Sequence, residues 1–156
     1  MYKKILMNNL IALLLYVLMS ILLMALNMII IQATAAFADI LVVPLIAVPL
    51  CVAIIAYIFC GFLLKPVEKL SFLSVVSVTI ALTILLIMFM QLGEAGVGYY
   101  FMNPIAWPLL QLMQFDIINA FRPFVVFLTV VFYLSPVFPS LLFYLGMVLR
   151  GRIVKR

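Results

Sequence analysis

The sequence predicts an all-α integral membrane protein with four transmembrane helices and both termini in the cytoplasm. Of its 156 residues, 71% are hydrophobic and only 8% are charged, whereas an ordinary soluble domain is roughly 45–50% apolar and about 25% charged. Four apolar stretches each reach the roughly 20 residues that a helix needs to cross a hydrocarbon core of about 30 Å. Basic residues lie at the ends of these stretches, where they orient a membrane protein.

The four apolar stretches define the expected elements. The predicted spans cover residues 5–31, 40–64, 72–90 and 124–149. An outer loop over 91–123 joins the third span to the fourth, and the whole forms a single transmembrane domain over 1–156. Backbone polar groups in lipid must be bonded within their own segment, so the spans are helices. Strands of a barrel would alternate in polarity over about 10 residues, and these stretches do not.

The distribution of lysine and arginine predicts the orientation. All but one of the nine basic residues fall on one side of a four-span arrangement. These are Lys3, Lys4, Lys65, Lys69, Arg150, Arg152, Lys155 and Arg156. Only Arg122 falls on the other side. The positive-inside rule then places the N-terminus, the loop over 65–70 and the C-terminus in the cytoplasm.

The first span has an alternative interpretation as a cleaved signal peptide. Ala33-Thr34-Ala35 resembles a signal-peptidase site, and Lys3 and Lys4 precede the apolar stretch. That stretch is about 27 residues long, however, against the 7–15 of an ordinary signal sequence. We therefore favour a retained anchor, while cleavage would leave three spans and an outer N-terminus.

The first span carries a row of polar side chains on one face. Asn9, Tyr16, Ser20 and Asn27 lie within about 40° of one another at the helical angle of about 100° per residue. Polar side chains that face lipid are costly, so this row is expected to face protein. One interpretation is a polar pathway for a substrate or a docking face for a partner. The other is a seam of hydrogen bonds between helices.

The second span carries small residues on one face. Pro49, Ala53, Ala56 and Cys60 share it. Small side chains let helix backbones approach closely, which favours association in lipid. We expect this face to meet another helix, most simply the first span, and a homodimer contact is the alternative.

Two prolines interrupt the middle of the fourth span. Pro136 and Pro139 remove helical hydrogen bonds and tend to kink the helix. Broken helices near the middle of a membrane often line transport sites. They also occur in ordinary bundles, where nearby serines such as Ser135 and Ser140 bond the freed backbone groups.

The outer loop is too apolar to be a free hydrophilic domain. Trp107 is expected at the level of the lipid headgroups, where aromatic side chains anchor a segment. Residues 104–121, which include Asp116, predict a short helix that lies on the membrane surface or enters it as a re-entrant piece. The alternative is that this segment, up to Arg122, pairs with a partner protein.

Several function classes are disfavoured by composition. The chain has no histidine, which removes the usual zinc sites and Ser–His or Cys–His pairs, so we expect no metal and no cofactor. The net charge of +5 comes from residues at the ends of spans, which does not predict nucleic-acid binding. No charged residue lies deep in a predicted span, although proton relays and ion pumps normally need such groups there.

The leading functional hypothesis is a non-catalytic membrane subunit or accessory protein of a larger envelope or transport assembly. Its expected partners are the lipid bilayer and other membrane subunits or a second copy of itself. One alternative is a small oligomeric permease or channel that uses Asn9, Asn27 and the kinked fourth span. Another is an outer-face enzyme that uses Asp39 and Asp116. In its general appearance the sequence is typical of a small multi-pass protein of a bacterial plasma membrane.

Overall fold

The described part of the chain is entirely helical. A computed structural model describes residues 2–34, 42–66, 72–92, 103–106, 108–109 and 122–154. The elements in chain order are α1 (Tyr2–Thr34), α2 (Val42–Leu63), the 3-10 helix η2 (Phe72–Ser74), α3 (Val76–Leu92), α7 (Arg122–Leu134) and α8 (Phe138–Val154). These ranges hold no β-strand. The predicted all-α class is therefore confirmed.

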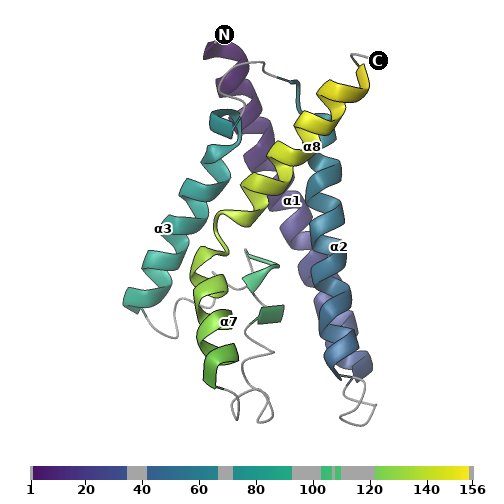
Figure 1. The fold of residues 1–156 in the computed structure, drawn as a ribbon, viewed down its shortest axis with the longest axis vertical. Coiled ribbons are helices and arrows are strands. Elements are labelled where there is room, and N and C mark those ends of the chain that lie inside the picture. The colour runs from purple at the N-terminus through teal and green to yellow at the C-terminus, as the bar shows by residue number, and fades with distance from the viewer. Residues whose placement is uncertain are drawn as a thin grey trace.

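The helices form a bundle in which both chain termini lie at the same end (Figure 1). α2 makes its most extensive contact with α8, and its next with α1. α3 packs against α1 and α8. α1 is long because its 33 residues include neither proline nor glycine, the two residues that most often end a helix.

The core extends into the outer loop. Buried side chains from all five α-helices form one cluster, which includes Tyr16, Tyr57, Leu82, Leu128 and Phe143. The segment of 103–106 and 108–109 contributes Ile105 and Leu109 to the same cluster. This segment lies between α7 and α2 (Figure 1). Residues 107 and 110–121 lie outside the described part of the chain, so the interfacial or re-entrant helix over 104–121 stays a prediction.

The stretch expected to form one fourth span is two helices. α7 ends at Leu134, α8 begins at Phe138, and the two axes differ by 67°. Pro136 has no N–H group, and its ring disfavours the helical conformation at Ser135, so the helix cannot continue here. The Val137 N–H instead donates to the carbonyl of Leu134 at 3.0 Å, within a tight turn. The stretch over 124–149, for which an interruption at Pro136 and Pro139 was predicted, is thus two helices joined by a bend.

Length and composition identify one helix in the described residues as able to cross a membrane, Tyr2–Ile30. The bent pair Pro123–Leu134 and Phe138–Ile153 adds a second if it counts as one span. The apolar stretches Ala47–Leu63 and Val76–Gln91 are shorter than this criterion requires. Signal sequences and buried core helices also satisfy it, so the four-span arrangement is not established by this criterion.

Candidate functional site

Asn9 of α1 bonds the start of α3. Its side-chain oxygen accepts a hydrogen bond from the Ser77 N–H at 2.9 Å, and its amide nitrogen donates to the Leu73 carbonyl at 2.8 Å. The Ser77 hydroxyl donates to the Asn9 carbonyl at 2.9 Å. The first N–H groups of a helix have no acceptor within that helix. Asn9 therefore acts as a cap supplied by a different helix.

The carboxyl end of α2 is capped from α1 and α8. The Asn8 amide nitrogen donates to the Lys65 carbonyl at 2.8 Å. The Arg150 guanidinium donates to the carbonyls of Phe62 at 2.8 Å and Leu64 at 3.1 Å. The last carbonyls of a helix lack partners within it and carry partial negative charge, so a cation there is stabilising. Sequence reasoning assigned Arg150 to orientation alone and missed this contact.

Replacing Arg150 with methionine is expected to lower the free energy of unfolding by about 1–2 kcal/mol, because two carbonyls lose a charged donor. Arg152 is exposed, so the matched Arg152→Met change is expected to stay within about 0.5 kcal/mol. Thermal unfolding of both variants in detergent micelles measures the difference. Equal losses in the two variants would contradict the capping role.

An aromatic cluster joins α1, α2 and α8. The rings of Tyr16 and Tyr57 stack with centroids 5.6 Å apart, and Phe143 meets Tyr57 edge-on at 5.6 Å. The Ser20 and Tyr57 hydroxyl oxygens lie 3.4 Å apart. Tyr16 and Ser20, from the predicted polar face, thus lie against Tyr57 of α2.

α2 and α8 cross with their backbones in contact at two glycines. A Cβ atom added to Gly61 would lie 3.0 Å from the Cα of Gly146 and closer still to the Phe143 carbonyl oxygen. One added to Gly146 would collide with the carbonyl oxygen of Ile58. Close approach of this kind requires glycine, and it permits weak Cα–H···O contacts between the helices.

The predicted small-residue face of α2 lies beside this crossing. Pro49, Ala53 and Cys60 are buried, and Ala56 is half-buried. The more extensive partner of α2 is α8 rather than α1. Gly61 follows Cys60 directly but was not included in the predicted face. The presence of Gly61 in one apolar helix and Gly146 in another was the sequence signal that could have revealed the crossing.

Buried polar side chains surround the break between α7 and α8. The Ser140 hydroxyl oxygen accepts hydrogen bonds from the N–H and the hydroxyl of Thr79 at 3.1 and 2.8 Å, and it donates to the Val75 carbonyl at 2.9 Å. The Asn103 amide nitrogen donates to the Ser135 hydroxyl at 3.0 Å. These bonds hold α8 to α3 and tie the loop segment to the break.

The two predicted kink residues occupy this break. Pro136 lies in the turn and Pro139 in the first turn of α8, and both are buried. Proline is tolerated in the first turn of a helix because the N–H it lacks has no acceptor there. Pro136 is therefore the residue that ends α7, and Pro139 is compatible with the start of α8.

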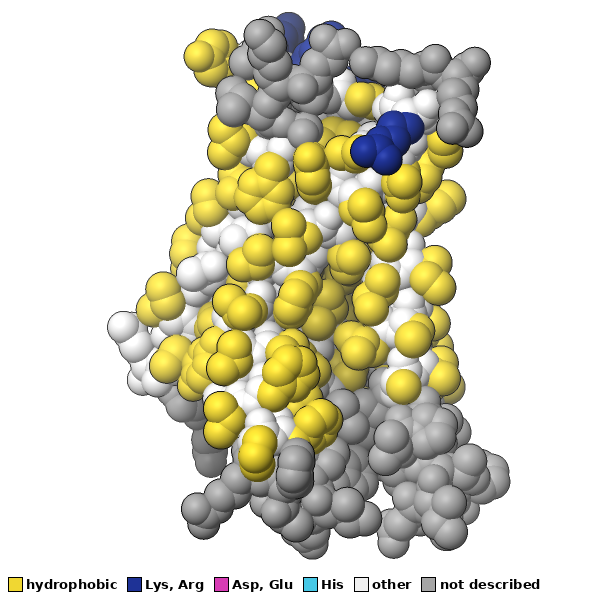
Figure 2. Space-filling model, viewed as in Figure 1, with side chains coloured by type: hydrophobic (Ala, Val, Ile, Leu, Met, Phe, Trp, Pro, Cys, Tyr) yellow, Lys and Arg dark blue, Asp and Glu magenta, His cyan; other side chains and the backbone are white. Residues whose placement is uncertain are grey.

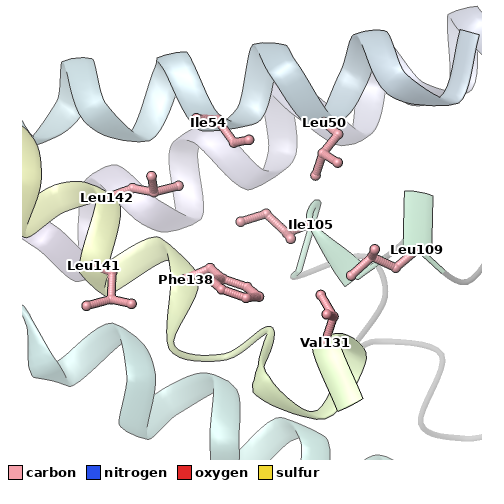
Figure 3. A pocket seen from close by; sticks show the side chains of 8 residues that line it. All are labelled: Leu50, Ile54, Ile105, Leu109, Val131, Phe138, Leu141 and Leu142. Atoms are coloured by element: carbon pink, nitrogen blue, oxygen red, sulfur yellow. The ribbon is translucent and has the colours of Figure 1, made fainter. Parts of the chain in front are cut away.

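An apolar cavity of about 350 Å³ lies beside the break (Figure 3). Its lining comes from α2, α7, α8 and the loop segment. The lining residues are Leu50, Ile54, Ile105, Leu109, Val131, Phe138, Leu141 and Leu142. None of these side chains can form a hydrogen bond, so the cavity suits a hydrocarbon.

Asn27, the last residue of the predicted polar face, is 7% exposed, and within the described part of the chain its side-chain oxygen has no hydrogen-bond partner. A buried acceptor without a donor costs about 1–3 kcal/mol. Asn27 therefore differs from Asn9, whose side chain is bonded to α3.

Other predicted residues lie outside the described part of the chain. These are Trp107 and the acidic residues Asp39 and Asp116. Arg122 begins α7, but its side chain is not among those described.

The two cysteines are free, Cys51 exposed and Cys60 buried.

Comparison of the chain with family models, curated proteins and solved structures finds no match. Asn8, Asn9, Ser140, Asn103 and Arg150 bond groups on neighbouring segments. These hydrogen bonds join the helices, and the apolar cavity lies between the joined helices.

Proposed function

We propose that this chain is an integral membrane protein of four spans that acts as a non-catalytic subunit or accessory protein of a larger membrane assembly. One observation carries the proposal: polar side chains inside the bundle bond to other helices, whereas large side chains on the outside are apolar. Such a molecule binds partners through helix packing in lipid, where small residues and buried polar bonds drive association.

Helix lengths support four spans. α1 has 33 residues and α2 has 22. The three residues of η2, then Val75 and the 17 residues of α3 form one apolar run. α7 and α8, with 13 and 17 residues, together form a bent fourth span. Each is close to or above the roughly 20 residues that a bilayer requires.

The outward surface supports a lipid environment. Large apolar side chains are exposed on every α-helix, for example Leu14 at 71%, Ile55 at 67% and Val126 at 63%. Figure 2 shows hydrophobic side chains over most of the length of one face. Proteins in water rarely expose contiguous apolar patches larger than a few hundred Å². Lipid removes the cost of this surface.

The charged end supports the orientation. In Figure 2, the lysine and arginine side chains in view lie toward the end where Figure 1 places both termini. By the positive-inside rule this end faces the cytoplasm of a plasma membrane. The last residues of α1 and α3 and the first residues of α2 and α7 then lie toward the outer side.

The membrane part of the proposal is tested by expressing the chain with a tag at either terminus. We expect the protein to stay in the membrane fraction after alkaline carbonate washing, and both tags to be inaccessible from outside intact cells. Extraction by carbonate would overturn the membrane assignment, and outside labelling of either tag would overturn the orientation.

The subunit part is tested by crosslinking in native membranes followed by purification in mild detergent. We expect a specific membrane partner, or a second copy of this chain, to be recovered with it. A protein that remains strictly monomeric and without partners contradicts the proposal.

A small oligomeric permease or channel is the second candidate. The buried, unpaired oxygen of Asn27 and the 67° break between α7 and α8 favour it. Broken helices near mid-membrane often line transport sites. Flux into proteoliposomes measures this function directly.

Asn27→Leu separates the two candidates. If Asn27 serves packing alone, removal of its unpaired oxygen is expected to leave stability unchanged or to raise it by about 1 kcal/mol. Asn9→Leu on the same helix is the matched comparison. It removes bonds to Ser77 and Leu73 and is expected to lower stability by about 1–2 kcal/mol. Loss of solute flux in folded Asn27→Leu protein would instead support the permease.

A further inference from the structure

The side chains that line the cavity beside the helix break indicate which class of ligand it binds. We propose that it binds one acyl chain of an anionic phospholipid, taken from the leaflet at the basic end of the bundle. The inference rests on the proposed membrane embedding and adds a ligand to it.

The lining selects a hydrocarbon. All eight side chains around the cavity are aliphatic or aromatic without a polar atom, from Leu50 on α2 to Leu142 on α8 (Figure 3). A polar group placed there would lose its hydrogen bonds to water without replacement. The volume of about 350 Å³ falls at the lower end of the roughly 300–1,000 Å³ found for small-ligand sites.

The cavity is reached from the side of the bundle. Leu141 is 43% exposed and Ile54 is 36% exposed, although both line the cavity. Part of the lining is therefore accessible from outside the bundle, on the surface that we propose to face lipid. A lipid chain can enter there without separation of the two helices at Gly61 and Gly146.

The depth of the cavity in the bilayer and the basic residues at one end of the bundle indicate which lipid supplies the chain. Along α8, Arg150 and Arg152 follow Leu142 by about 12–15 Å at roughly 1.5 Å per residue. This is about half of a hydrocarbon core of roughly 30 Å, the depth that one acyl chain covers. Arg152 and Lys65 are exposed at that level. Basic residues at a membrane surface attract anionic headgroups, so a headgroup at this level places its chain at the cavity.

The flexibility of a hydrocarbon chain favours it over a helix from a partner protein. A helix would have to enter as a rod about 10–12 Å wide. A hydrocarbon chain has no such minimum width, so it adapts more readily to a cavity of about 350 Å³.

The test uses the full chain in nanodiscs made with phosphatidylglycerol that carries a photoreactive diazirine in one acyl chain. After illumination, we expect labelled positions to concentrate in the stretches 50–54 and 138–142. Val131→Trp fills the cavity and is expected to lower this labelling about tenfold, since excluding two methylene groups weakens apolar binding by roughly that factor. Val126→Trp, on an exposed face of the same helix, is the matched control and is expected to leave labelling unchanged.

Ile54→Trp, at the rim of the cavity, provides a second blocked variant in case Val131→Trp does not fold. Even labelling along all helices, or labelling that neither blocked variant reduces, overturns the inference. So does recovery of a partner polypeptide crosslinked at 138–142 in native membranes. Failure of the protein to enter nanodiscs contradicts the proposed membrane function, whereas entry with even labelling contradicts the acyl-chain site alone.

Discussion

Gly146→Leu should prevent stable association of α2 with α8, with a loss of more than about 3 kcal/mol in the free energy of unfolding. A Cβ atom at this position collides with the backbone carbonyl of Ile58, which cannot move without displacing α2. Overpacking of a rigid contact usually costs about 1–3 kcal/mol, and the further atoms of leucine add to it. The α2–α8 contact is the most extensive in the bundle, so little else can compensate.

Gly151→Ala is the matched control for this change. Its added Cβ atom meets only the Pro66 side chain, at the ordinary distance of 3.6 Å. We expect that variant to keep its stability or to gain up to about 1 kcal/mol, as a glycine-to-alanine change in a helix often does. Thermal unfolding and size-exclusion chromatography in detergent compare the two variants. A monodisperse Gly146→Leu protein with unchanged unfolding temperature would show that the two helices do not cross at these glycines.

Asn103→Leu should lower the free energy of unfolding by about 2–3 kcal/mol and release the loop segment from the break. Asn103 is completely buried and donates to the Ser135 hydroxyl at 3.0 Å. Its side-chain oxygen also accepts from the N–H groups of Ile105 and Ala106 at 3.3 and 3.4 Å. Loss of buried partners costs more than loss of exposed ones, because water cannot replace them.

Thr129→Val controls for the removal of a polar group. The Thr129 hydroxyl donates only to the Val125 carbonyl one turn earlier in α7, so its loss is expected to cost no more than about 0.5 kcal/mol. Limited proteolysis within residues 93–121 reports release of the segment, and denaturant titration reports stability. If both variants behave alike, Asn103 does not anchor the loop.

The positions of the helices follow closely from apolar length. The stretches expected over 5–31 and 40–64 are α1 and α2, with bounds of Tyr2–Thr34 and Val42–Leu63. The third stretch, over 72–90, is η2 followed by α3. A long run of apolar residues specifies a helix locally, even where it includes Pro49 and Gly61 as in α2, which is why these elements could be predicted.

The contacts between helices could be predicted only in part. Pro136 and Pro139 mark where the helix is interrupted. The 67° angle between α7 and α8 also depends on the hydrogen bonds of the Ser135 and Ser140 hydroxyls, whose partners lie on other segments. Arg150 has the same charge as its neighbour Arg152, and only its position near the end of α2 distinguishes it. Proximity of this kind leaves no periodic pattern along the chain.

The sequence by itself determined that the chain is helical, where its apolar helices lie and which ends carry positive charge. These properties depend on residues near one another in the chain. The tertiary structure alone decided that Gly61 meets Gly146, that Asn9 caps α3, and that a wholly apolar cavity remains beside the break. The reason is that these features arise from groups 60 to 90 positions apart, whose meeting depends on how the helices cross.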